Sequence, residues 1–205
     1  MVLDMHLFGL SPSRLRHQER YGKRLEEFKE FLEEMEGDTL LFVLEYIRTQ
    51  IGYAVPTPDT LSYLLAFLEG KKVLEVGAGR GWFASAVTKF GNPASYVASD
   101  VKGVRGKVEE MRHTTALEAY GDSADVLVLL WPPYAEAMAL EALEAFKGDY
   151  VLYCGEGTDG CTADDAFHER LDEEWELLFE EDSFRFPLGS IGLNDTFNLY
   201  RRKTN

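Results

Sequence analysis

The chain has 205 residues, of which 45% are hydrophobic, and this is enough to build one domain with a full core. No apolar run approaches the roughly 18 residues of a membrane span, and the N-terminus has no signal-peptide pattern, so we expect a cytoplasmic protein with no membrane association. With 36 acidic and 21 basic residues, the formal net charge is −15. Such a charge favours neutral or cationic ligands and disfavours nucleic acid.

The two cysteines do not form a recognisable motif. Six residues separate Cys154 from Cys161, which fits neither a C-x-x-C redox pair nor a usual zinc spacing. We therefore expect two free thiols and no metal site.

The first third of the chain is predicted to be helical. Hydrophobic residues recur at three- and four-residue spacings over 18–35, which is typical of an amphipathic helix, and a second helix is expected over Thr39–Gln50. Two prolines then impose an extended segment before a third helix over Thr60–Leu68. Residues 1–70 are therefore predicted to form a helical extension before the rest of the fold.

A glycine-rich turn follows the first predicted strand. The segment 73–82 reads VLEVGAGRGW, and a helix is expected over Trp82–Lys89. The three glycines let the backbone adopt positive φ and come close to a ligand. The helix that follows directs the free N–H groups of its first turn toward the same ligand. A dinucleotide fingerprint, G-x-G-x-x-G, would need glycine where this chain has Trp82. The spacing therefore favours a nucleotide-like cofactor other than NAD.

A second acid lies at the spacing expected for ribose recognition. The strand-like segment Ser95–Ser99 ends at Asp100, about 19 residues after Gly81. An acid at the tip of the second strand can accept hydrogen bonds from both ribose hydroxyls. A ligand-free βα turn and an ordinary turn aspartate are the alternative interpretations of these two features.

Strands and helices alternate in the next part of the chain, which indicates an α/β fold. Continuous apolar runs at 125–131 and 150–154 are typical of buried parallel strands, with a helix expected between them at Ala135–Phe146. A further helix is expected at 163–172. Strands expected at 175–180 and 196–201 would form an antiparallel pair at the edge of the sheet.

Glu75, two residues before the G-x-G-x-G of Gly77, Gly79 and Gly81, completes a pattern that resembles motif I of class I S-adenosylmethionine (SAM)-dependent methyltransferases. The resemblance implies a Rossmann-like, doubly wound, seven-stranded, mostly parallel sheet with an antiparallel last strand inserted between the fifth and sixth. Residues 71–205 would be the SAM-binding core of a single domain, 1–205, that begins with the helical extension. The residues implied to hold the cofactor SAM are Glu75, Gly77, Ala78, Gly79, Gly81, Trp82 and Asp100.

The fourth predicted strand ends in Trp131-Pro132-Pro133-Tyr134, whose prolines hold the chain extended. It resembles the Asn-Pro-Pro-Tyr or Asp-Pro-Pro-Tyr of amino-group methyltransferases, in which the first residue holds the target nitrogen and the aromatic ring lies against the acceptor. In this chain Trp131 stands at the position of that polar residue and offers only its backbone carbonyl. Nitrogen methylation therefore does not follow from the resemblance alone. The chain is also similar, over about 53–175, to a methyltransferase-like group that shares Trp-Pro-Pro-Tyr and has no assigned acceptor. A stiff turn is the alternative interpretation.

We predict a SAM-dependent methyltransferase that acts on a small or accessible acceptor, either a small molecule or a protein. The candidate catalytic residues are Tyr134, Glu156 and His113, with structural roles as the alternatives for Glu156 and His113. The acceptor would be bound by Tyr53, Trp131, Pro132, Pro133, Tyr134 and Glu156. A catalytically inactive SAM-binding regulatory or partner protein is an alternative, favoured by Trp131. An NAD-type oxidoreductase is another, opposed by Trp82.

Overall fold

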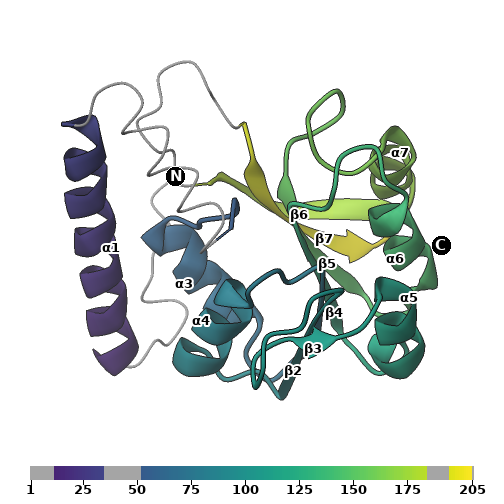
Figure 1. Cartoon of the computed structure of the whole chain (residues 1–205), viewed down its shortest axis with the longest axis horizontal. Coiled ribbons are helices and arrows are strands. Elements are labelled where there is room, and N and C mark those ends of the chain that lie inside the picture. Colours follow the sequence, from purple (N-terminus) through teal and green to yellow (C-terminus); the bar gives the residue numbers. More distant parts are fainter. Residues whose placement is uncertain (1–11, 35–51, 184–193, 205) are drawn as a thin grey trace.

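The structure, a computed structural model, describes residues 12–34, 52–183 and 194–204, in which helices cover both faces of one central sheet (Figure 1). Helices α3 and α4 lie on one face, with α1 outside α3, and α5, α6 and α7 lie on the other. The helices are α1 (Pro12–Glu33), α3 (Pro58–Phe67), α4 (Trp82–Phe90), α5 (His113–Ala116), the π-helical turn η2 (Leu117–Gly121), α6 (Met138–Ala145) and α7 (Asp165–Glu174).

The sheet has seven strands in the order β3-β2-β1-β4-β5-β7-β6. The first five pair in parallel, and β7 is antiparallel to both of its neighbours. This confirms the predicted doubly wound sheet, including the insertion of the last strand. The strands are β1 (Lys72–Val76), β2 (Ser95–Asp100), β3 (Glu109–Glu110), β4 (Val126–Leu130), β5 (Tyr150–Gly155), β6 (Trp175–Asp182) and β7 (Thr196–Arg202).

The chain order reverses between β1 and β4. Connections from β1 run outward to β2 and β3, whereas those from β4 run the other way to β5. In open α/β sheets, ligands bind outside the carboxyl ends of the strands at such a switch point. We therefore expect a ligand site at the segments that follow β1 and β4.

Alternate residues of β4 contribute to two hydrophobic cores. Leu127 and Leu129 pack in the core under α6 and α7, and Val126 and Val128 pack in the core under α3 and α4. All four side chains are 0% exposed. This explains why β4 is a continuous apolar run rather than an alternating one.

Two helices begin later than the sequence predicted. Helix α6 begins at Met138 because Ala135 adopts a positive φ of 54° and donates its N–H to the carbonyl of Ala163. Helix α7 is capped by Asp164, whose carboxylate accepts the N–H of Phe167 at 2.9 Å. The start of α6 thus depends on a long-range contact between two loops, which local periodicity does not contain, whereas the start of α7 depends on a local cap.

The predicted helix over Thr39–Gln50 lies outside the described residues, whereas α1 extends the first predicted helix back to Pro12. The Tyr21 hydroxyl of α1 donates to the carbonyl of Pro56 at 2.8 Å, which ties α1 to the segment before α3. None of the described helices combines the length and apolar composition needed to cross a membrane.

Candidate functional site

The turn between β1 and α4 contains three glycines with positive φ, at Gly77, Gly79 and Gly81. At Gly81 a Cβ would lie 2.6 Å from a methyl carbon of Val108, so this glycine is required by packing. At Gly79, where φ is 54°, no heavy atom lies within 4 Å of the Cβ position. Gly79 therefore borders open space, and a side chain there would project into it.

Asp100, at the end of β2, is hydrogen-bonded to this turn. One carboxylate oxygen accepts the N–H of Gly79 at 2.9 Å, and the other accepts the N–H of Lys102 at 3.0 Å. The structure thus brings together the two features that the sequence predicted to share a ligand. Both are located at the carboxyl ends of adjacent parallel strands.

Glu75 is buried beneath the turn, with 2% of its surface exposed. Its carboxyl accepts the hydroxyl of Tyr96 at 2.8 Å. Burial is the main reason that the pKa of Glu75 rises to about 8, and the nearby negative charge of Asp100 adds to the increase, while the Tyr96 hydrogen bond opposes it. The protonated form of Glu75 is therefore favoured at neutral pH.

Two cavities open at this edge of the sheet. The smaller, of about 230 Å³, is lined by residues 52–54, Glu75, residues 77–80, Trp82, Phe83, Leu130 and Trp131. The larger, of about 750 Å³, is lined by residues 76–77, Asp100, Val101, residues 110–113, residues 131–133, Glu136 and Met138. Gly77 and Trp131 line both cavities, so the two cavities adjoin at the ends of β1 and β4.

Trp131 is fixed from three directions. Its backbone has a φ of 53°, and its N–H donates to the carbonyl of Cys154 at 2.7 Å. The indole stacks on Tyr53 with 4.6 Å between ring centroids, and its Nε1 donates to Asp195 at 3.2 Å. The structure therefore brings the predicted acceptor residues Tyr53 and Trp131 together, and Pro132 and Pro133 line the larger cavity beside them.

Three other predicted site residues have different positions. Tyr134 is 66% exposed and is not among the residues that line either cavity. The two carboxylate oxygens of Glu156 accept the N–H groups of Cys161, at 2.7 Å, and Asn194, at 3.0 Å, and Glu156 is not among the residues that line either cavity. His113 lines the larger cavity, and its Nε2 lies 2.6 Å from the carboxylate of Glu141.

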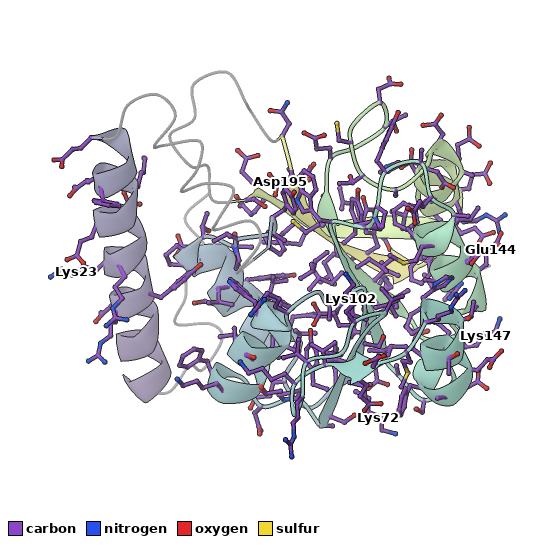
Figure 2. All side chains as sticks on the ribbon, viewed as in Figure 1. Lys23, Lys72, Lys102, Glu144, Lys147 and Asp195 are labelled. Atoms are coloured by element: carbon purple, nitrogen blue, oxygen red, sulfur yellow. The ribbon has the colours of Figure 1, made fainter. Side chains whose placement is uncertain are left out.

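Asp195 is a site residue that the sequence analysis did not identify. It lies at the start of β7, at the opposite end of the sheet from Lys72 (Figure 2), and is 5% exposed. Its indole partner is 64 residues away in the sequence. No local pattern indicates the contact, because it exists only once β7 is inserted beside β5.

The described residues contain no group of three or more His, Cys, Asp and Glu side chains arranged to hold a metal ion. Cys154 is buried, Cys161 is exposed, and both are free thiols.

This chain shares its fold, rather than a recognisable sequence, with known proteins. No protein-family model matches the sequence, and no curated protein matches it. A structure from Streptococcus pneumoniae, described as a candidate tRNA (m1A22) methyltransferase in complex with S-adenosyl-L-methionine, is 14% identical. That match covers 72% of this chain and 73% of the other, with a TM-score of 0.51.

Two further structures are similar over most of this chain. A Thermoplasma acidophilum protein is 14% identical over 79% of this chain and 97% of its own, with a TM-score of 0.50. A candidate SAM-dependent methyltransferase from Streptococcus mutans is 9% identical with a TM-score of 0.50; the match covers 70% of this chain and 48%, about half, of that protein. With the strand order, these similarities define the fold as that of class I methyltransferases.

Proposed function

We propose that the protein is a SAM-dependent methyltransferase of class EC 2.1.1. The observation that carries the proposal is the hydrogen bond between Asp100 and the Gly79 N–H, which joins the glycine turn to the acid of the next strand at the edge of two cavities. The S. pneumoniae structure with the same fold contains S-adenosyl-L-methionine, which supports this choice of ligand.

The residues present fit such a ligand. We assign the adenosine part to the larger cavity, where Asp100 accepts hydrogen bonds from the ribose hydroxyls and the 66% exposed Val101 offers apolar surface to the base. We assign the methionine part to the smaller cavity, beside Glu75 and the turn residues Ala78 and Gly79. When bound, SAM supplies a methyl group on a positively charged sulfur.

The chain's own contribution is to orient the acceptor and exclude water. Gly77 and Trp131 line both cavities, so we place the acceptor at this junction, against the rings of Tyr53 and Trp131. Alignment of reacting groups supplies effective molarities of roughly 10⁵ M or more, so a methyl transfer of this kind needs no covalent catalyst. Pro132 and Pro133 stiffen the segment that would hold the acceptor in place.

The acceptor is proposed to be a small molecule or an accessible group on a protein. Only the net charge of −15 disfavours nucleic acid as the acceptor. A structure with the same fold is described as a candidate tRNA methyltransferase, so the fold does not support excluding nucleic acid.

A SAM-binding protein without transferase activity is the second candidate. It is favoured by the indole of Trp131, which replaces a polar side chain and is engaged by Asp195 and Tyr53. Methyl-release assays on a panel of amine, hydroxyl and thiol acceptors separate an active enzyme from a binding protein.

Calorimetry with S-adenosylhomocysteine (SAH) tests the assignment of the cofactor. We expect SAH to bind and NAD not to bind, and Asp100→Ala to weaken SAH affinity by about tenfold to a thousandfold, because two hydrogen bonds to a charged acceptor are lost.

Asp125→Ala is the matched control. Asp125 also accepts a backbone N–H, that of Lys72 at 2.8 Å, but at the other end of β1. Asp125→Ala should leave SAH affinity within about threefold of the native value. Undiminished SAH binding by Asp100→Ala would refute the proposed ribose contact.

A further inference from the structure

Asp195 places a negative charge behind the indole ring of Trp131. The carboxylate is 5% exposed and accepts from Trp131 Nε1 at 3.2 Å and from the Cys154 thiol at 3.7 Å. Burial raises the pKa of Cys154 well above its usual range, and the nearby Asp195 adds to the increase, so this partner stays neutral. Among the ion pairs of the described residues, none involves Asp195.

A buried carboxylate that accepts from an indole N–H changes what the ring attracts. The hydrogen bond polarises the indole and enriches its face in electron density, and that face already attracts cations through its quadrupole. Tyr53 stacks on the same indole at an interplanar angle of 22°, and both rings line the smaller cavity. The two rings form one surface, which we call the Tyr53–Trp131 wall, and Asp195 lies behind it. Trp131 also lines the larger cavity, so the wall reaches the junction where we place the acceptor, beside the space that we assign to the methionine part.

The other charged side chains that line this cavity oppose a cation there only weakly. Glu75 and Arg80 are the two, and burial favours the neutral form of Glu75. Arg80 is exposed, so solvent screens its charge. The net charge of −15 adds a long-range attraction for positive ligands.

We propose that the Tyr53–Trp131 wall, backed by Asp195, binds an alkylamine acceptor and its methylated ammonium product. The proposal rests on the proposed methyltransferase function. The alkylammonium that the wall attracts first releases a proton to water. The lone pair of the resulting neutral amine then forms the new N–C bond with the methyl carbon while the C–S bond breaks and its electron pair stays on sulfur. The positive charge thus moves from sulfur to nitrogen, and an ammonium that carries hydrogen then releases a proton to water.

In this arrangement the wall faces the charge that grows on nitrogen during the transfer. An interaction that strengthens in the transition state accelerates the reaction, whereas equal binding of both states does not. Asp195 acts through the ring and is a positioning residue, and Tyr53 and Trp131 are the groups that touch the acceptor.

Choline and its neutral carbon isostere, 3,3-dimethyl-1-butanol, test the wall as a matched pair of probes. Both are titrated into the SAH complex of the full chain, and binding is followed by tryptophan fluorescence and by NMR. We expect saturable binding of choline and a preference for choline over the alcohol of about fivefold to thirtyfold, the range given by a desolvated cation–π contact.

Asp195→Asn is the decisive variant, because the amide has nearly the shape of the carboxylate and can still accept from the indole. It should reduce the preference for choline about threefold, because the two rings still attract a cation without the charge behind them, and it should leave SAH affinity unchanged; an undiminished preference would overturn the role of Asp195. Tyr53→Leu should weaken choline about tenfold, whereas the control Phe31→Leu, which removes a 50% exposed ring on α1 that lines neither cavity, should change nothing. If Asp195→Asn does not fold, Tyr53→Leu, at a 40% exposed position, decides the question.

The outcomes separate this inference from the proposed function. SAH binding without choline binding, or equal binding of choline and the alcohol, overturns the amine proposal and leaves the methyltransferase proposal intact. Adenosine monophosphate binding to the SAH complex in place of choline also overturns it, since a nucleobase would then be the acceptor. Failure of the native chain to bind SAH removes both proposals.

Discussion

At the scale of single residues, Glu75 shows how the site tolerates a buried acid. The Tyr96 hydroxyl donates to it at 2.8 Å, and burial raises its pKa to about 8. A protonated carboxyl is far less costly to bury than a carboxylate, so the group keeps its proton in the folded chain at neutral pH. The unfolded chain releases that proton near the ordinary pKa of 4.5.

This difference predicts a pH-dependent stability. Because the folded pKa is higher than the unfolded one, the stabilisation by Glu75 is fully present below about pH 4.5 and is lost as the pH rises toward about 8. Between pH 5.5 and 7.5 the free energy of unfolding should fall by about 2 kcal/mol more in the native protein than in Glu75→Gln, whose amide can still accept from Tyr96. Urea unfolding of both proteins at the two pH values measures the difference. Parallel pH profiles would show that Glu75 is ionised in the folded state.

At the scale of elements, the β1–α4 turn uses two glycines for different reasons. Gly81 makes room for Val108, whereas Gly79 borders open space at the smaller cavity. A substitution at Gly81 therefore tests packing, and one at Gly79 tests binding.

Gly79→Val should abolish SAH binding in a protein that still folds, because its side chain enters the space that we assign to the ligand. The positive φ of 54° adds a backbone penalty of about 1–2 kcal/mol. Gly70→Val is the control, since Gly70 also has a positive φ, of 71°, and also borders open space. It lies just before β1 begins, at the end of that strand opposite to the glycine turn. Calorimetry and thermal melts on both variants should show similar losses of stability and a loss of SAH binding in Gly79→Val alone. Retained binding by Gly79→Val would mean that the turn does not hold the ligand.

At the scale of the whole molecule, the sheet couples the two hydrophobic cores. Strands β1, β4 and β5 contribute residues to both cores, so neither face can unfold without exposing the other. A chain built in this way is expected to unfold in one cooperative transition.

Calorimetric scans test that expectation together with the ligand. SAH at about 100 times its dissociation constant adds about 2.7 kcal/mol of stability, which corresponds to an increase in Tm of roughly 5–10 °C for a chain of this size. The Tm from calorimetry and that from tryptophan fluorescence should coincide and should shift together. Two transitions, only one of which responds to SAH, would show that the 1–205 chain is more than one folding unit.

Local patterns and the geometry of parallel sheets determined much of the fold and part of the site. The apolar runs of β4 and β5, the glycine turn and Asp100 are read from neighbouring residues. The rule that parallel strands end at one edge then places Asp100 beside the turn, as the Gly79 hydrogen bond shows.

The surroundings of Trp131 were decided by tertiary structure. The Trp131–Asp195 hydrogen bond joins residues 64 positions apart, and it forms because β7 is inserted beside β5. The same long-range packing leaves Tyr134 exposed and directs both oxygens of Glu156 to loop N–H groups, although the sequence pattern suggested the site for both. Local sequence specifies backbone preference and the burial of one face, whereas the partner of a polar side chain depends on which distant segment packs against it.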